Sequence, residues 1–103
     1  MPWGDWINEL PAEFFLVVHT AAFALGAGFA WRAFRRELSV LGTAFSLFAA
    51  AEVVYMTYHL DWTVFLFAHT IAEVLDLVAF VLVFAAAVWE GAAARRPLLD
   101  VSR

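Results

Sequence analysis

Five ionisable side chains lie inside long apolar stretches of this chain, where such groups are costly. They are His19, Glu52, His69, Glu73 and Asp76. An ionisable group in the middle of a membrane-spanning helix costs about 2.5–3.5 kcal/mol on insertion scales, so it is a candidate functional residue. His59 lies one heptad after Glu52 and extends the set. Imidazole and carboxylate together can bind a metal ion, flank a haem or exchange protons.

The spacing of these residues predicts that they share helix faces. His69, Glu73 and Asp76 follow the i, i+4, i+7 pattern of one helical face, and Glu52 and His59 share a face in the same way. Polar groups within membrane spans turn towards other helices rather than towards lipid. We therefore expect these two faces, together with the face of the first helix that carries His19, to enclose a polar pocket in the outer half of the membrane.

Three kinds of site fit such a pocket. The first is a transition-metal ion, because imidazole suits zinc, copper, iron and nickel, and carboxylates add negative charge. Its candidate ligands are His19, Glu52, His59, His69, Glu73 and Asp76. The second is haem b with His19 and His69 as axial ligands, although the carboxylates beside His69 have no part in haem coordination. The third is proton movement through a chain of acidic and imidazole groups.

The elements that must position these residues are three apolar runs. Residues 11–31, 39–58 and 62–89 are each long enough to cross a bilayer, which takes roughly 20 apolar residues per helix. The connections between them are short, and short connections make successive helices antiparallel neighbours. Asp61 is a candidate N-cap of the third helix. The sequence therefore predicts an all-α fold, an antiparallel three-helix transmembrane bundle over residues 11–90.

The two ends of the chain are predicted to lie outside this bundle. In residues 1–10, Trp3, Trp6, Ile7 and Leu10 follow the spacing of one apolar helix face, which predicts a short interfacial helix. Residues 91–103 are expected to form a cytoplasmic tail. Arginines follow the first and third runs, whereas the opposite ends carry acidic residues and no arginine. The positive-inside rule therefore predicts an N-terminus outside the cell membrane and a cytoplasmic C-terminus.

The composition excludes several classes of function. The chain of 103 residues is 65% hydrophobic and 16% charged, against about 45–50% apolar residues in soluble domains. It contains no cysteine, which excludes disulfides, iron–sulfur clusters and thiolate metal sites. The formal net charge is −4, so the chain lacks the excess of basic residues that is typical of nucleic-acid-binding proteins. The chain has no recognised nucleophile or phosphate-binding motif, so we do not expect an enzyme.

The middle of the chain resembles a family of membrane proteins. Residues 31–36 and 41–45, followed by a second span that carries Glu52, are similar to uncharacterised small multi-span membrane proteins of halophilic archaea. The likeness covers residues 25–84, and the alanine-rich, lysine-free composition agrees with it. Because such proteins have no assigned activity, the resemblance implies nothing about function.

These observations lead to one functional expectation and two alternatives. We expect a small integral membrane protein with an outer-leaflet His/carboxylate site for a metal ion or protons. It would act within a homo-oligomer or a larger membrane complex. The first alternative is a non-catalytic accessory subunit whose polar faces are interfaces between helices or subunits. The second is a membrane subunit that binds haem b through two histidines.

Overall fold

The computed structural model describes residues 3–101, and it describes side chains for residues 3–89. Throughout this part the chain is helical, and no strand occurs in it. The elements are a 3-10 helix η1 (Asp5–Glu9) and the helices α1 (Ala12–Arg35), α2 (Ser39–His59) and α3 (Phe65–Val101). The all-α prediction is therefore confirmed. Three segments are long and apolar enough to cross a membrane, namely Ala12–Arg35, Ser39–His59 and Phe65–Trp89.

The ends of the chain differ from the expectation. The predicted interfacial α-helix is not seen, because only the 3-10 helix η1 lies in its place and residues 1–2 fall outside the described part. Gly4 has a left-handed φ of 92° before η1, and Leu10 is extended after it, so the turn cannot propagate in either direction. At the other end α3 continues to Val101, and most of the predicted tail is therefore helical.

Two tight turns connect the three helices, and both place a non-glycine residue in the left-handed region. Glu37 has a φ of 61° and Asp61 a φ of 62°. After α2 the amide of Trp62 donates to the carbonyl of Thr57 at 2.9 Å, which is the six-to-one bond of a Schellman motif. The turn after α1 has the equivalent bond. Asp61 therefore ends α2, and the expectation that it caps the third helix is wrong.

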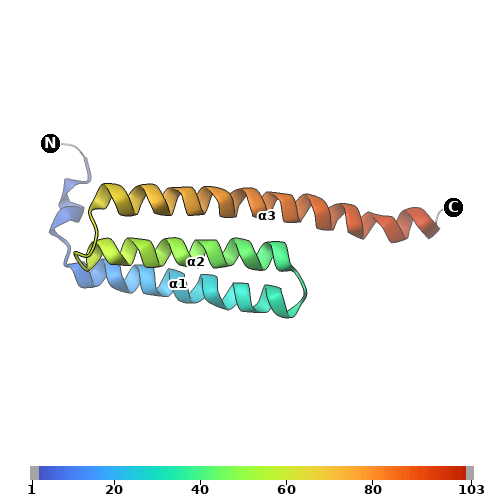
Figure 1. The fold of residues 1–103 in the computed structure, drawn as a ribbon, viewed down its shortest axis with the longest axis horizontal. Coiled ribbons are helices and arrows are strands. Elements are labelled where there is room, and N and C mark those ends of the chain that lie inside the picture. The colour runs from blue at the N-terminus through green and yellow to red at the C-terminus, as the bar shows by residue number, and fades with distance from the viewer. Residues whose placement is uncertain (1–2, 102–103) are drawn as a thin grey trace.

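The three helices form a layer in which α2 lies between α1 and α3 (Figure 1). The colour gradient in Figure 1 shows that each helix returns along the one before it. Helix α2 packs against both neighbours, but α1 and α3 are not in contact within the described residues. The predicted closed bundle is thus not confirmed. What the structure has in its place is a layer with a groove between α1 and α3.

Small residues allow the helices to approach one another. The buried apolar residues are alanines, and the described part contains no large side chain that is fully buried. Gly26 of α1 lies against Phe48 of α2, and Gly42 of α2 lies against Phe34 of α1. Large apolar side chains instead cover the outside of the layer, where they are exposed. This distribution is typical of membrane helices, whose close contacts use small residues while lipid covers the large ones.

The contact at Gly26 gives a test of this packing. A Cβ atom at position 26 would lie 2.8 Å from Cδ1 of Phe48, whereas one at Gly28 of the same helix would meet nothing within 4 Å. We expect Gly26→Leu to destabilise the fold by about 1–3 kcal/mol through overpacking. Gly28→Leu is the matched control and should cost less than about 0.5 kcal/mol. Unfolding of the detergent-solubilised protein measures both, and equal stability of the two variants would contradict the packing.

Candidate functional site

The centre of the candidate site is a pair of ionisable side chains from α1 and α2. Nδ1 of His19 and Oε2 of Glu52 are 2.5 Å apart, and only 18% and 12% of the two side chains are exposed. Among the described residues this is the only ion pair. Arg32 and Arg35 lie in the last turn of α1, at the opposite end of that helix. The imidazole of His19 is therefore the partner of the buried carboxylate.

This hydrogen bond orients the imidazole of His19. When the carboxylate of Glu52 is ionised it only accepts hydrogen bonds, so Nδ1 of His19 carries the proton and donates it. Nε2 then points away from the carboxylate and can accept or donate a further hydrogen bond. A carboxylate that holds one ring nitrogen in this way fixes the tautomer of the ring.

A column of stacked rings surrounds the pair. The ring of His19 stacks on Tyr55, with centroids 5.2 Å apart and planes at 13°. The ring of His59 stacks on the same imidazole, with centroids 5.3 Å apart and planes at 28°. His59 in turn stacks on Phe15, with centroids 4.7 Å apart and planes at 1°. The rings alternate between α1 and α2. Because three of them belong to residues that can gain or lose a proton, the column joins His59 near the end of α2 to the buried pair.

Helix α3 joins this column through Tyr55. The hydroxyl of Tyr55 and Nδ1 of His69 are 3.3 Å apart, and the ring of Phe65 stacks on His69 at 5.2 Å. From the sequence alone, Tyr55 is not predicted to belong to the site, because an aromatic residue near a membrane interface is common. One signal would have placed it in the site, because Tyr55 lies one turn after Glu52 and one turn before His59 on the same face of α2.

The two remaining carboxylates lie further along α3. Glu73 is exposed, whereas Asp76 is half-buried. Oδ1 of Asp76 is buried and has no hydrogen-bond partner among the described residues. Of the candidate residues, the structure brings together His19, Glu52 and His59, and it links His69 to them through Tyr55.

This arrangement does not provide the predicted metal and haem ligands. Within residues 3–89 no group of three or more His, Asp or Glu side chains is placed to hold a metal ion. For a haem, His19 and His69 would have to face each other across the macrocycle. The ring of Tyr55 lies between them instead, with centroids 5.2 Å from His19 and 6.5 Å from His69. The residues therefore do not fit a bis-histidine haem.

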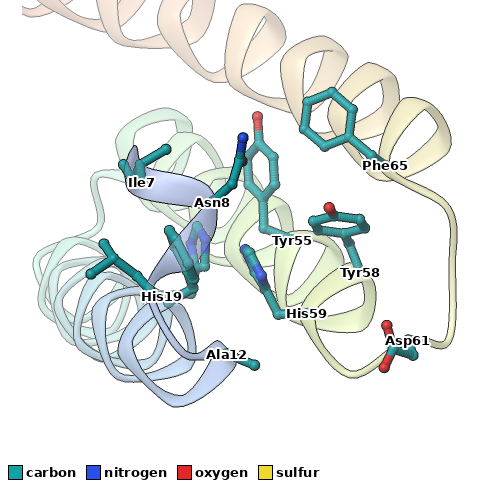
Figure 2. A pocket seen from close by; sticks show the side chains of 11 residues that line it. Ile7, Asn8, Ala12, His19, Tyr55, Tyr58, His59, Asp61 and Phe65 are labelled. Carbon is teal, nitrogen blue, oxygen red and sulfur yellow. The ribbon is translucent and has the colours of Figure 1, made fainter. Parts of the chain in front are cut away.

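A cavity of about 440 Å³ opens beside the ring column, at the end of the layer near η1. Figure 2 shows His19, Tyr55 and His59, which line it together with Asn8 of η1 and Phe65 of α3. Imidazole nitrogens, a phenol hydroxyl and aromatic side chains thus meet in one cavity. Such a lining can hydrogen-bond a polar group and contact an apolar one.

The buried pair makes a testable contribution to stability. In Glu52→Gln the bond from His19 loses its ionised acceptor, and charge-assisted hydrogen bonds are stronger than neutral ones. We expect the variant to be less stable by about 1–2 kcal/mol, measured by thermal unfolding in detergent. Glu73→Gln makes the same chemical change at an exposed position and should stay within about 0.5 kcal/mol of the parent. Glu52→Gln with unchanged stability would contradict the pairing.

The comparisons with known proteins leave the chain without an assigned relative. No protein-family model, curated protein or solved structure matches it. The resemblance to small membrane proteins of halophilic archaea therefore stays a prediction. The roles of His19, Glu52 and the ring column follow from their geometry alone.

Proposed function

We propose that this chain is a small integral membrane protein that binds and exchanges protons at a His/carboxylate site in the outer half of the membrane. It would act within a homo-oligomer or a larger membrane complex. The observation that carries the proposal is the 2.5 Å separation of His19 Nδ1 and Glu52 Oε2 in a largely buried pair. A proton in this hydrogen bond can be passed between the imidazole and the carboxylate.

The surroundings of the pair support proton exchange. The imidazole of His59 stacks on His19, and both line the cavity that opens at the end of the layer. This cavity gives protons a route to the pair. Tyr55 also lines the cavity and lies 3.3 Å from His69, which adds a further donor and acceptor. Chains of acidic and imidazole groups are the usual proton carriers inside membrane proteins.

Metal binding at this site is less well supported than proton exchange. Structural and catalytic zinc sites use three or four protein ligands, and the described residues bring together no group of that kind. His19 is committed to Glu52 through Nδ1, which leaves one nitrogen of this ring for any other partner. A proton needs only the pair that the geometry provides.

The distribution of charge favours a site that opens to one side of the membrane. Residues 20–31, 38–51 and 77–89 contain no ionisable side chain. Protons therefore have no side-chain route from the pair to the opposite surface through these segments. The same segments separate the site from Arg32 and Arg36. By the positive-inside rule the arginines face the cytoplasm, so the site opens outside and the N-terminus lies on that side.

Infrared difference spectroscopy of the reconstituted protein tests the proposal. When the pH of the outer solution changes, a buried carboxyl that gains a proton gives a carbonyl stretching band. We expect this band in the parent protein, its loss in Glu52→Gln, and a shifted band in His19→Gln, because the hydrogen-bond partner has changed. Glu73→Gln is the matched control and should retain the band.

Two results would overturn proton exchange at this site. One is a parent spectrum that Glu52→Gln leaves unchanged, since the titrating carboxyl would then lie elsewhere. The other is a transition metal present in about equal number to the polypeptide in protein purified without chelator, as counted by elemental analysis, because bound metal would replace the shared proton. We expect metal well below that level.

A second function, assembly, is favoured by α3. Asp76 has a buried oxygen without a partner among the described residues, and His69 and Glu73 on the same face are exposed. Each such group is costly against lipid, and a second subunit could supply the missing hydrogen bonds. Polar contacts between membrane helices contribute about 0.6–2 kcal/mol each, so several of them together would hold a complex.

The mass of the protein in mild detergent tests assembly. We expect the parent protein to form a dimer or a larger oligomer and Asp76→Asn to shift the distribution towards the monomer, because the amide alters the hydrogen-bond pattern at the contact. Asp61→Asn makes the same change in the exposed turn and should leave the mass unchanged. A monomeric parent protein would contradict homo-oligomer assembly through this face.

A further inference from the structure

The groove between α1 and α3 contains a second cavity that the proton site does not use. It has a volume of about 440 Å³ and is lined by all three helices, with α2 as its floor. Ala22 and Gly26 of α1, Phe45 and Phe48 of α2 and Val83 of α3 make it apolar. Asp76 is the only ionisable residue of this lining. Because the layer is not closed over α2, the cavity lies open at the depth of the membrane core.

The apolar cavity continues the polar one along the same helix faces. On α1 the polar cavity ends at His19 and the apolar cavity begins at Ala22, one turn or about 4.5 Å further along the axis. On α2 Tyr55 and Phe48 line the two cavities, with Glu52 between them on the same face. The lining of α1 runs from Ala12 to Phe29, or about 26 Å.

The chemistry of this groove changes along its length. Its outer end offers Nε2 of His19, which the bond to Glu52 leaves free, together with the hydroxyl of Tyr55. Aromatic side chains also line this end, namely Phe15, Tyr58 and Phe65. Its inner end is lined by aliphatic and aromatic carbon. A complementary molecule has a flat head with hydrogen-bonding oxygens and a long apolar tail.

We propose that the groove binds a membrane-soluble quinone or quinol, with its ring in the outer cavity against His19 and Tyr55 and its tail in the apolar cavity. Nε2 of His19 would accept a hydrogen bond from a quinol hydroxyl, or donate one to a quinone carbonyl when the imidazole is protonated, and the aromatic side chains that line the outer cavity would contact the ring. Each cavity has the size of a typical ligand pocket. The proposal concerns binding alone. It goes beyond proton exchange and does not depend on it.

Binding of decylubiquinone to the purified protein in detergent tests the proposal. Quinones quench tryptophan fluorescence, and Trp62 is exposed in the turn beside the outer cavity. We expect saturable quenching by the parent protein. Ala22→Phe fills the apolar cavity and should weaken binding at least about tenfold. Ala21→Phe adds the same ring to the neighbouring, exposed position of α1 and should leave the affinity within about twofold.

The head of the ligand is tested separately from its tail. His19→Leu should also weaken decylubiquinone about tenfold, since one hydrogen bond is lost. An excess of decylbenzene, which has the tail and a ring but no oxygens, should not displace the quinone. Equal binding by Ala21→Phe and Ala22→Phe would overturn the proposal. So would unchanged affinity in His19→Leu, or displacement by decylbenzene, which would show a groove that takes any apolar chain.

This experiment separates the two proposals. Ala22→Phe changes no ionisable residue, so it should lose the quinone while the carbonyl band of Glu52 still titrates. Saturable quinone binding by a protein without that band would support the groove and reject proton exchange. A titrating band in a protein that shows no saturable quenching would support proton exchange and reject quinone binding in the groove.

Discussion

Glu52 is 9% exposed on the middle helix of an apolar layer, and the arrangement of the end of the layer near η1 depends on its partner. A charge that is buried without a partner destabilises a protein strongly. His19 supplies the partner from α1 at 2.5 Å, and the bond fixes both the orientation of its ring and the contact between the two helices. Tyr55 and His59 then stack on that fixed ring, so the column follows from the pair.

The packing of the helices decides what surrounds this pair. Alanine and glycine at the contacts bring α2 close to both neighbours, while α1 and α3 stay apart. In water a layer of this kind would close to bury its apolar groove. In a membrane lipid covers exposed carbon without penalty, so the helices gain little from closing. The groove is thus a consequence of the same small-residue contacts that hold the layer together.

Two chemistries follow from one groove because the polar residues lie at only one end of it. His19, His59 and Tyr55 line the end of the groove near η1, and carbon lines the rest except at Asp76. The proposed proton exchange would use the pair and its route to that end of the layer. The proposed quinone binding would use the free nitrogen of the same imidazole and the apolar length beyond it. Asp76 lines the apolar cavity, and its unpartnered oxygen is the feature on which the proposed contact with another subunit rests.

The sequence by itself determined the helical elements, because hydropathy and helical period are local properties. The runs at 11–31, 39–58 and 62–89 correspond to the three apolar helices, and the spacing of Glu52 and His59 placed both on one face. Candidate residues His19, Glu52 and His59 could be named for the same reason. The sequence could not show whether the candidate metal ligands come together, because that depends on distances between helices.

Only the tertiary structure decided how the faces meet. It places Tyr55 between His19 and His69, which argues against paired axial ligands, and it leaves Glu73 exposed on α3. It also puts Asp61 at the end of α2 rather than at the start of α3. These outcomes depend on helix rotation and on turn conformation. Contacts between residues far apart in the chain set the rotation, and no local pattern in the sequence records it.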